Sequence, residues 1–227
     1  MIPPLHLITD DATLSRPDFV SQARLAMTAG GRLAALHLRG PRLGGRTIFE
    51  LAGALREDGL ETGCLLLVND RLDVALALDL PGAHLGQRSL PPGVAREILG
   101  PGRILGLSVH GREEGEEGRK GEVDFLLVGT IFATPSHPEG TPGGVARIRE
   151  VAVLDSPPML GIGGITPGRV EAVLEAGAHG VAVRGGVWDA PDPAAAVGVY
   201  LKEMARCSGE APKGPVSPGT RDQRRVK

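Results

Sequence analysis

The chain has 227 residues, which suits one large α/β domain or two small ones. Its net charge of −2 and aromatic content of 3% argue against a polyanion-binding surface and against base-stacking platforms, so we expect no nucleic-acid partner. No basic start precedes the first apolar run, and no run approaches the roughly 20 apolar residues of a membrane span. We therefore expect a cytoplasmic protein without a signal peptide or a membrane partner.

Short apolar runs alternate with helix-period segments along most of the chain. The expected strands are Leu5–Thr9, Ala34–Leu38, Leu65–Asn69, Ala83–Leu85, Ile104–Ser108, Phe125–Gly129, Met159–Ile162 and Gly180–Val183. The expected helices lie near Arg16–Gly30, Arg46–Asp58, Leu72–Leu78, Pro92–Leu99, Glu113–Lys120, Val145–Leu154, Pro167–Ala176 and Pro193–Cys207. This alternation predicts a parallel sheet, and its eight strand–helix units predict an α/β fold with one domain, a TIM (β/α)8 barrel over residues 1–207.

The last segment, residues 208–227, differs in composition from the rest. It is rich in proline, glycine and charge, and its end is basic. Such a segment cannot bury enough apolar surface to offset its ordering entropy. We expect a disordered basic tail.

Two glycine-rich turns follow the last two expected strands. Gly163 and Gly164 stand in the first turn, where Thr166 and Pro167 suit the start of a helix. The second turn holds Gly185 and Gly186. Glycines let a backbone approach a ligand closely, and N–H groups at helix starts attract phosphate. The pair matches the phosphate site that TIM barrels form after strands seven and eight, although plain tight turns are the alternative.

Polar residues crowd the carboxyl ends of the other expected strands, where TIM barrels carry their chemistry. They are Asp10 and Asp11 after strand one, Arg39 after strand two, Asn69, Asp70 and Arg71 after strand three, Arg88 and Ser89 after strand four, Ser108 and His110 at strand five, and the loop Thr130–Gly144 after strand six. Asp10 and Asp11 also suit helix caps. His37 and His84 lie within strands, where packing in the barrel is the expected role.

Several segments resemble one family. LITDD, ALHLRG, LLVNDRLDVALA, GAHLGQRSLP, ILGLSVH, DFLLVGTIFAT, GIGGITP and GVAVRGG occur in the order typical of thiamine phosphate synthase and the TenI-like thiazole tautomerase. The resemblance runs from about Leu5 to Trp188 and implies a TIM barrel, a homo-oligomer, and a small phosphorylated thiazole as ligand. The synthase joins this thiazole to hydroxymethylpyrimidine diphosphate with the help of Mg²⁺, whereas the tautomerase moves a proton.

The resemblance implies roles for single residues. Thiazole phosphate would bind Gly163, Gly164, Gly185 and Gly186, with glycine at 185 where the family often has serine. Arg39 is retained, but Pro41 stands in place of a lysine. Asp70 matches one Mg²⁺ carboxylate, and Ser89 replaces the second, so Mg²⁺ is expected only at a weakened site.

Further positions complete the expected site. Asn69, Arg88, His110, Thr134 and Ser136 are expected to bind substrate, and Arg39 and Ser108 to take part in catalysis. His137 stands where the synthase has a lysine. Two roles are open for Asp70, as a metal ligand or as an ion-pair partner of Arg71. For Arg39, the alternative to catalysis is an ion pair with Asp70.

Relative to the synthase, the expected diphosphate site lacks one carboxylate and two lysines. This loss favours proton transfer of the tautomerase type. His137 is the expected base, because histidine exchanges protons near neutral pH and Thr130 replaces the family's tautomerase histidine. The synthase reaction, with Arg88 and His137 supporting the diphosphate, is the first alternative. A barrel that binds the phosphate ligand without turnover is the second.

Overall fold

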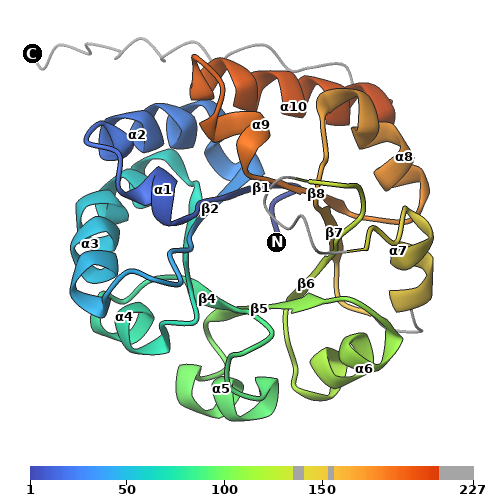
Figure 1. The fold of residues 1–227 in the computed structure, drawn as a ribbon. Helices are drawn as coiled ribbons and strands as arrows, with labels where there is room; N and C mark the ends of the chain where they lie inside the picture. Colours follow the sequence, from blue (N-terminus) through green and yellow to red (C-terminus); the bar gives the residue numbers. More distant parts are fainter. Residues whose placement is uncertain (135–140, 153–155, 210–227) are drawn as a thin grey trace, which may run out of the picture.

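The computed structural model describes residues 1–134, 141–152 and 156–209, and these residues form one closed barrel. Eight parallel strands follow one another in chain order around it, as Figure 1 shows in a view along the barrel. They are β1 (Leu5–Ile8), β2 (Ala34–Leu38), β3 (Leu65–Asn69), β4 (Gly82–Leu85), β5 (Ile104–Val109), β6 (Phe125–Val128), β7 (Met159–Ile162) and β8 (Gly180–Val183). The predicted TIM barrel and its eight strands are confirmed.

An outer ring of helices covers the barrel. Its members are α1 (Asp11–Leu14), α2 (Phe19–Gly30), α3 (Gly45–Thr62), α4 (Leu72–Ala77), α5 (Pro92–Leu99), α6 (Arg112–Lys120), α7 (Ala146–Val151), α8 (Val170–Glu175), α9 (Gly185–Trp188) and α10 (Pro193–Ser208), with 3₁₀ turns η1 (Gly31–Leu33) and η2 (Pro167–Arg169). α10, the last helix, packs beside α2 near the start of the chain, and this contact closes the outer ring (Figure 1). None of the described helices is long and apolar enough to cross a membrane.

The short helices α1 and α9 were not expected from the sequence. Asp10 is the N-cap of α1 and its carboxylate accepts a hydrogen bond from the Thr13 backbone N–H, so its predicted capping role is confirmed. Thr166 occupies the N-cap position of η2, but its side chain makes no capping hydrogen bond. Both short helices begin right after a barrel strand and turn the chain sharply at the rim.

Strand side chains divide into two sets. Those facing outward pack against the helices in one large apolar cluster. Those facing inward include a smaller apolar cluster of Ile8, Leu67, Phe125, Leu127, Leu160 and Ala182. The inward set also includes His6, His37 and His84, all fully buried. Three buried imidazoles are unusual in a barrel interior, which branched apolar side chains commonly fill.

Gly106 makes room for this interior. A Cβ at Gly106 would lie 2.5 Å from His84 Nδ1 and would overlap the Phe125 ring. The ring of His84 stacks on Phe125 with centroids 5.5 Å apart. The glycine in β5 therefore allows an imidazole and a phenyl ring to share the centre of the barrel.

Candidate active site at the carboxyl rim

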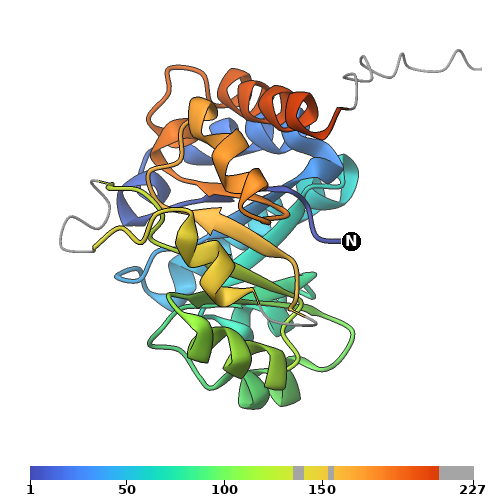
Figure 2. The same ribbon diagram turned by 90° about the vertical axis from the view of Figure 1, so that its right-hand side faces the viewer.

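The strands of the barrel all end at one rim, which Figure 2 shows from the side. The two glycine turns lie next to each other there, because β7 and β8 are paired neighbours. Gly163 and Gly164 have φ angles of 104° and 60°, the left-handed region that favours glycine. A Cβ at Gly163 would lie 2.6 Å from Thr130 Cγ2, and one at Gly164 would overlap the Ala133 carbonyl. Both glycines are required by the turn itself.

The backbone N–H groups of this side are available to a ligand. Within the described part of the chain, no acceptor receives the N–H groups of Gly163, Gly164, Gly185 or Gly186. The last two stand in the first turn of α9, whose N–H groups have no partner inside the helix. Neighbouring backbone donors of this kind can hold a phosphate oxygen.

Arg184 separates β8 from this turn and is ion-paired. Its Nη1 lies 2.7 Å from Asp10 Oδ2, which links the ends of β8 and β1. Partial burial tends to raise the pKa of Asp10, but hydrogen bonds from Thr13 and the Arg184 guanidinium outweigh it and lower that pKa. The Arg184 charge is thus partly balanced by a fixed carboxylate.

Arg39 follows β2, two strands away from β8 in the barrel, and differs from Arg184. Its backbone is held by Thr9, whose Oγ1 accepts the Arg39 N–H at 2.8 Å and donates to the Arg39 carbonyl at 3.1 Å. Its half-buried guanidinium has no partner among the described residues. A partly buried, unpaired guanidinium is a strong candidate for binding an anionic ligand. The predicted ion pair between Arg39 and Asp70 is absent from the described structure.

Asp70 follows β3 with a φ of 60°, which is unusual outside glycine. Its Oδ1 accepts the Gly86 N–H at 2.7 Å and so links the ends of β3 and β4, while Oδ2 has no hydrogen-bond donor among the described residues. Arg71 pairs with Asp73 instead, at 2.5 Å, so the predicted Asp70–Arg71 ion pair is also absent. Strained backbone of this kind is commonest at functional sites.

The interpretation of Asp70 as a Mg²⁺ ligand depends on its single carboxylate. The described residues contain no group of three or more His, Cys, Asp or Glu side chains that could hold a metal ion. Mg²⁺ can also bind through one or two carboxylates completed by substrate phosphates and water. The exposed Asp70 fits this second mode, in which Ser89 adds no charge.

Ser108 is held by a buried histidine. His84 Nε2 lies 2.8 Å from Ser108 Oγ, whereas the buried His84 Nδ1 has no partner among the described residues. Burial, followed by His37 and Arg39, lowers the pKa of His84 well below its ordinary value of 6.5, so the ring is neutral. The neutral ring is most stable with its proton on Nε2, since an unpaired buried N–H costs more than an unpaired lone pair. Ser108 Oγ then accepts from His84 and keeps its own proton for a ligand.

The remaining predicted residues have different settings. Exposed His110 is held by the Gln87 side-chain N–H at 2.7 Å and lies 3.5 Å from Glu114. Arg88 is exposed and has no partner within the described residues. Thr134 is half-buried and is the last described residue before position 135 in the loop after β6. Ser136 and His137 lie outside the described residues, so their predicted roles stay predictions.

Sequence reasoning missed one feature, the contact between His6 and His37. His6 Nδ1 lies 2.9 Å from His37 Nε2, and His37 Nδ1 lies 3.3 Å from Asn69 Oδ1. The sequence shows both residues within neighbouring strands, but only the register of β1 and β2, in which Ile8 is paired with His37, brings the two rings together. Asn69 is thus connected to the barrel interior as well as to the rim.

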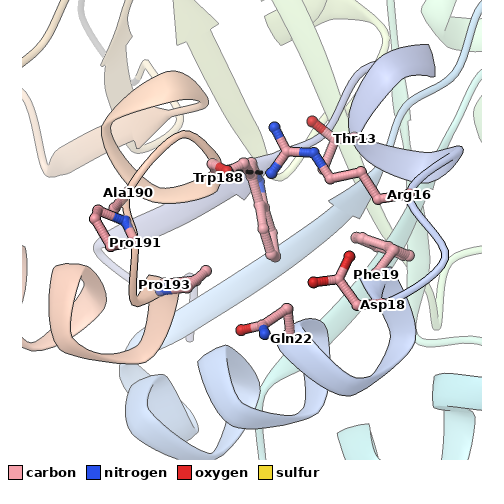
Figure 3. A pocket seen from close by; sticks show the side chains of 9 residues that line it. All are labelled: Thr13, Arg16, Asp18, Phe19, Gln22, Trp188, Ala190, Pro191 and Pro193. Carbon is pink, nitrogen blue, oxygen red and sulfur yellow. Dashed lines mark hydrogen bonds between the residues drawn. The ribbon is translucent and has the colours of Figure 1, made fainter.

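A separate pocket lies in the outer layer (Figure 3). Its volume is about 80 Å³, and residues of α2 and of the segment after β8 line it, among them Phe19, Gln22, Trp188 and Pro193. Arg16 crosses its mouth, where it donates to the Trp188 carbonyl and pairs with Asp189 at 3.2 Å. A space of this size holds a few water molecules. We therefore place the functional site at the rim.

Fold and rim together define a class: a TIM barrel whose rim carries unpaired backbone N–H groups beside a cluster of polar and cationic side chains. The comparisons with known proteins give the family. A family model described as thiamine monophosphate synthase matches residues 5–187. The chain belongs to this thiamine phosphate synthase/TenI family, as its motifs predicted.

Individual relatives agree. The bifunctional ThiM/ThiE protein of Symbiobacterium thermophilum is 40% identical over 207 residues, which cover 91% of this chain but only 42% of that longer protein. A thiamine-phosphate synthase of Roseiflexus castenholzii is 39% identical over 193 residues, 85% of this chain and 84% of its own. The solved thiamine phosphate pyrophosphorylase of Pyrococcus furiosus superimposes with a TM-score of 0.78 at 32% identity, over 89% of this chain and 96% of that one.

Proposed function

We propose that the protein is a thiamine phosphate synthase, which joins a thiazole phosphate to hydroxymethylpyrimidine diphosphate and releases diphosphate. The observation that carries this proposal is the unpaired, half-buried Arg39 at the end of β2, which β1 separates from β8 and its glycine turn. A transferase for two phosphorylated substrates needs two anion sites, and the rim offers two of different construction. Several relatives bear this activity in their names.

On the first side, the N–H groups of Gly163, Gly164, Gly185 and Gly186 hold the phosphate of the thiazole. Fixed backbone donors orient this substrate with little cost in side-chain entropy. On the other side, Arg39 binds the diphosphate, and Arg88 reaches it from the loop after β4. Asn69 and Ser108 hold the pyrimidine between them.

In the reaction, the bond between the pyrimidine methylene carbon and the diphosphate oxygen breaks while the thiazole nitrogen forms a bond to that carbon. Negative charge develops on the departing diphosphate, and Arg39 stabilises it. Asp70 would hold Mg²⁺, which neutralises further charge on this leaving group. His110, fixed by Gln87 and Glu114, borders the same mouth as a substrate-binding residue.

The hypothesis of tautomerase-type proton transfer, which the sequence favoured, has less support than the synthase hypothesis. Several relatives are named thiamine-phosphate synthase, which agrees with the alternative that the sequence left open. Within the described residues, Thr130 leaves the tautomerase base position without a titratable group. The homo-oligomer stays a prediction. The predicted start of the tail at residue 208 is wrong, because α10 extends to Ser208 and Gly209 is its C-cap. Residues 210–227 lie outside the described residues, so their predicted disorder stays a prediction.

Turnover tests the proposal directly. The protein is incubated with thiazole phosphate and hydroxymethylpyrimidine diphosphate, with Mg²⁺ or with a chelator, and thiamine phosphate and diphosphate are measured. We expect both products in equal amounts with Mg²⁺ and a large loss of rate with chelator. Aromatisation of the thiazole tautomer without coupling would favour the tautomerase instead, and binding without turnover would favour a carrier or sensor.

A further inference from the structure

A chain of buried hydrogen bonds runs up the inside of the barrel from its amino end to the rim. It begins at the Pro3 carbonyl oxygen, which lies 3.1 Å from His6 Nε2. It continues from His6 Nδ1 to His37 Nε2 at 2.9 Å, and from His37 Nδ1 to the Asn69 side chain, whose Oδ1 lies 3.3 Å away. Both rings are fully buried, and Phe125 packs its ring against each of them.

The first contact determines where the protons lie. A carbonyl oxygen can only accept, so His6 Nε2 must carry a proton. Burial, with smaller effects of His37 and His84, lowers the pKa of His6 well below its ordinary value, so the ring is neutral and Nδ1 is a bare acceptor. His37 must then donate to it from Nε2.

The same reasoning reaches Asn69. Burial lowers the pKa of His37 to about 3, so His37 is also neutral. Its proton is on Nε2, which leaves Nδ1 as an acceptor. The Asn69 amide must therefore turn over from the orientation with Oδ1 toward His37 and present its NH₂ group instead, since an amide can turn over and a backbone carbonyl cannot. The opposite arrangement would place bare His6 Nε2 against the Pro3 carbonyl, two buried acceptors without a proton.

We infer that His6 and His37 are positioning residues that turn the Asn69 amide so that its Oδ1 faces the barrel mouth as a hydrogen-bond acceptor. The inference rests on the proposed function for the identity of the ligand. The aminopyrimidine of thiamine carries an exocyclic amino group, a donor that suits an oxygen and would be repelled by an NH₂ group. The chain of hydrogen bonds from Pro3 through His6 and His37 to Asn69, called the relay below, thus selects a substrate ring with an amino group over one with an oxo group at that position.

Nuclear magnetic resonance of the ligand-free protein tests the relay without any assay of activity. The wild-type protein is labelled with ¹⁵N in its histidine rings, and two-bond correlations are recorded at pH 7.5, with assignments from single His→Gln variants. We expect His6 and His37 each to show a protonated Nε2 and a bare Nδ1. A proton on His37 Nδ1 would overturn the inference, whether or not the protein proves to be a synthase.

A matched pair of variants tests the consequence for substrate binding. His6→Phe fills the space but removes the acceptor, so His37 can move its proton to Nδ1 and Asn69 can turn over. We expect the KM for the pyrimidine diphosphate to rise about tenfold, with the KM for thiazole phosphate and kcat changed less than about twofold. His6→Gln offers an N–H and an oxygen at the spacing of the two ring nitrogens and should restore the wild-type KM.

A purely structural role for His6 predicts another pattern. Both variants would then lower the melting temperature and leave both KM values unchanged, which would overturn the inference. If His6→Phe fails to fold, the tautomer of His37 in the wild-type protein and the KM of His6→Gln still decide it.

Discussion

The two sides of the rim are built in different ways. The β7–β8 side offers backbone N–H groups, and the fold itself demands glycine at three of the four positions, namely Gly163, Gly164 and Gly186. The β2–β5 side offers side chains, and there Pro41 and Ser89 stand where related synthases carry charge. A backbone site is retained as long as the fold is retained, whereas a side-chain site can change one residue at a time. We therefore expect substitutions on the β2–β5 side to lower mainly the activity, and substitutions of the required glycines on the β7–β8 side to lower mainly the stability.

The largest effect is expected at Arg39. Arg39→Met should lower kcat/KM for the pyrimidine diphosphate by about 10²–10³-fold, because a donor to the charge that develops on the leaving group is lost. Steady-state kinetics with each substrate varied in turn would measure it. The control is Arg42→Gln, which removes an exposed guanidinium paired with Asp11 and should stay within about twofold of the wild type. A loss of less than about threefold for Arg39→Met would show that the diphosphate binds elsewhere.

On the backbone side, the expected signature is a loss of stability. A Cβ at Gly186 would overlap the hydroxyl of Tyr200, which is buried and donates to the Ile165 carbonyl at 2.9 Å. Gly186→Ser should lower the melting temperature by roughly 3–10 °C, since overpacking costs about 1–3 kcal/mol. Calorimetric melting would detect it.

Gly185 provides the matched control. A Cβ there would lie 2.7 Å from Asp189 Oδ2, the tip of an exposed side chain that can move away. Gly185→Ser should leave the melting temperature within about 2 °C. The added hydroxyl should lower the KM for thiazole phosphate about three- to tenfold, because it donates to a charged group. Equal melting temperatures for the two serine variants would contradict the packing argument.

A smaller effect is expected from restoring charge at position 89. Ser89→Asp should lower the Mg²⁺ concentration for half-maximal rate by roughly tenfold, since each added carboxylate strengthens a magnesium site. Ser89→Asn has a similar size without the charge and should not change it. If both variants need the same Mg²⁺ concentration as the wild type, position 89 lies too far from the metal to matter.

The smallest effect is expected from deleting residues 210–227. If their basic end supplied the charge that the β2–β5 side lacks, the deletion would raise the KM for the pyrimidine diphosphate. We expect no such rise and a melting temperature within about 2 °C of the full chain, because a segment of this composition has little apolar surface to bury. A severalfold rise in KM would make the tail part of the site.

Much of the fold could be predicted from the sequence, because hydrophobic period and glycine placement are local signals. The eight strands and the cap at Asp10 were found in this way, whereas α1 and α9 were missed because each has only four residues. Ion-pair partners could not be predicted, since Arg71 has two carboxylates within reach and takes Asp73. The contact between His6 and His37 depends on the register of neighbouring strands, which composition does not reveal.

The most direct test of the two-sided rim is a crystal structure with thiazole phosphate, diphosphate and Mg²⁺ bound together. We expect the thiazole phosphate group against the N–H groups of Gly163, Gly164, Gly185 and Gly186, and the diphosphate against Arg39 with the metal ion at Asp70. Both anions on the same side of the rim, or a diphosphate that leaves the Arg39 guanidinium without a ligand, would contradict the account.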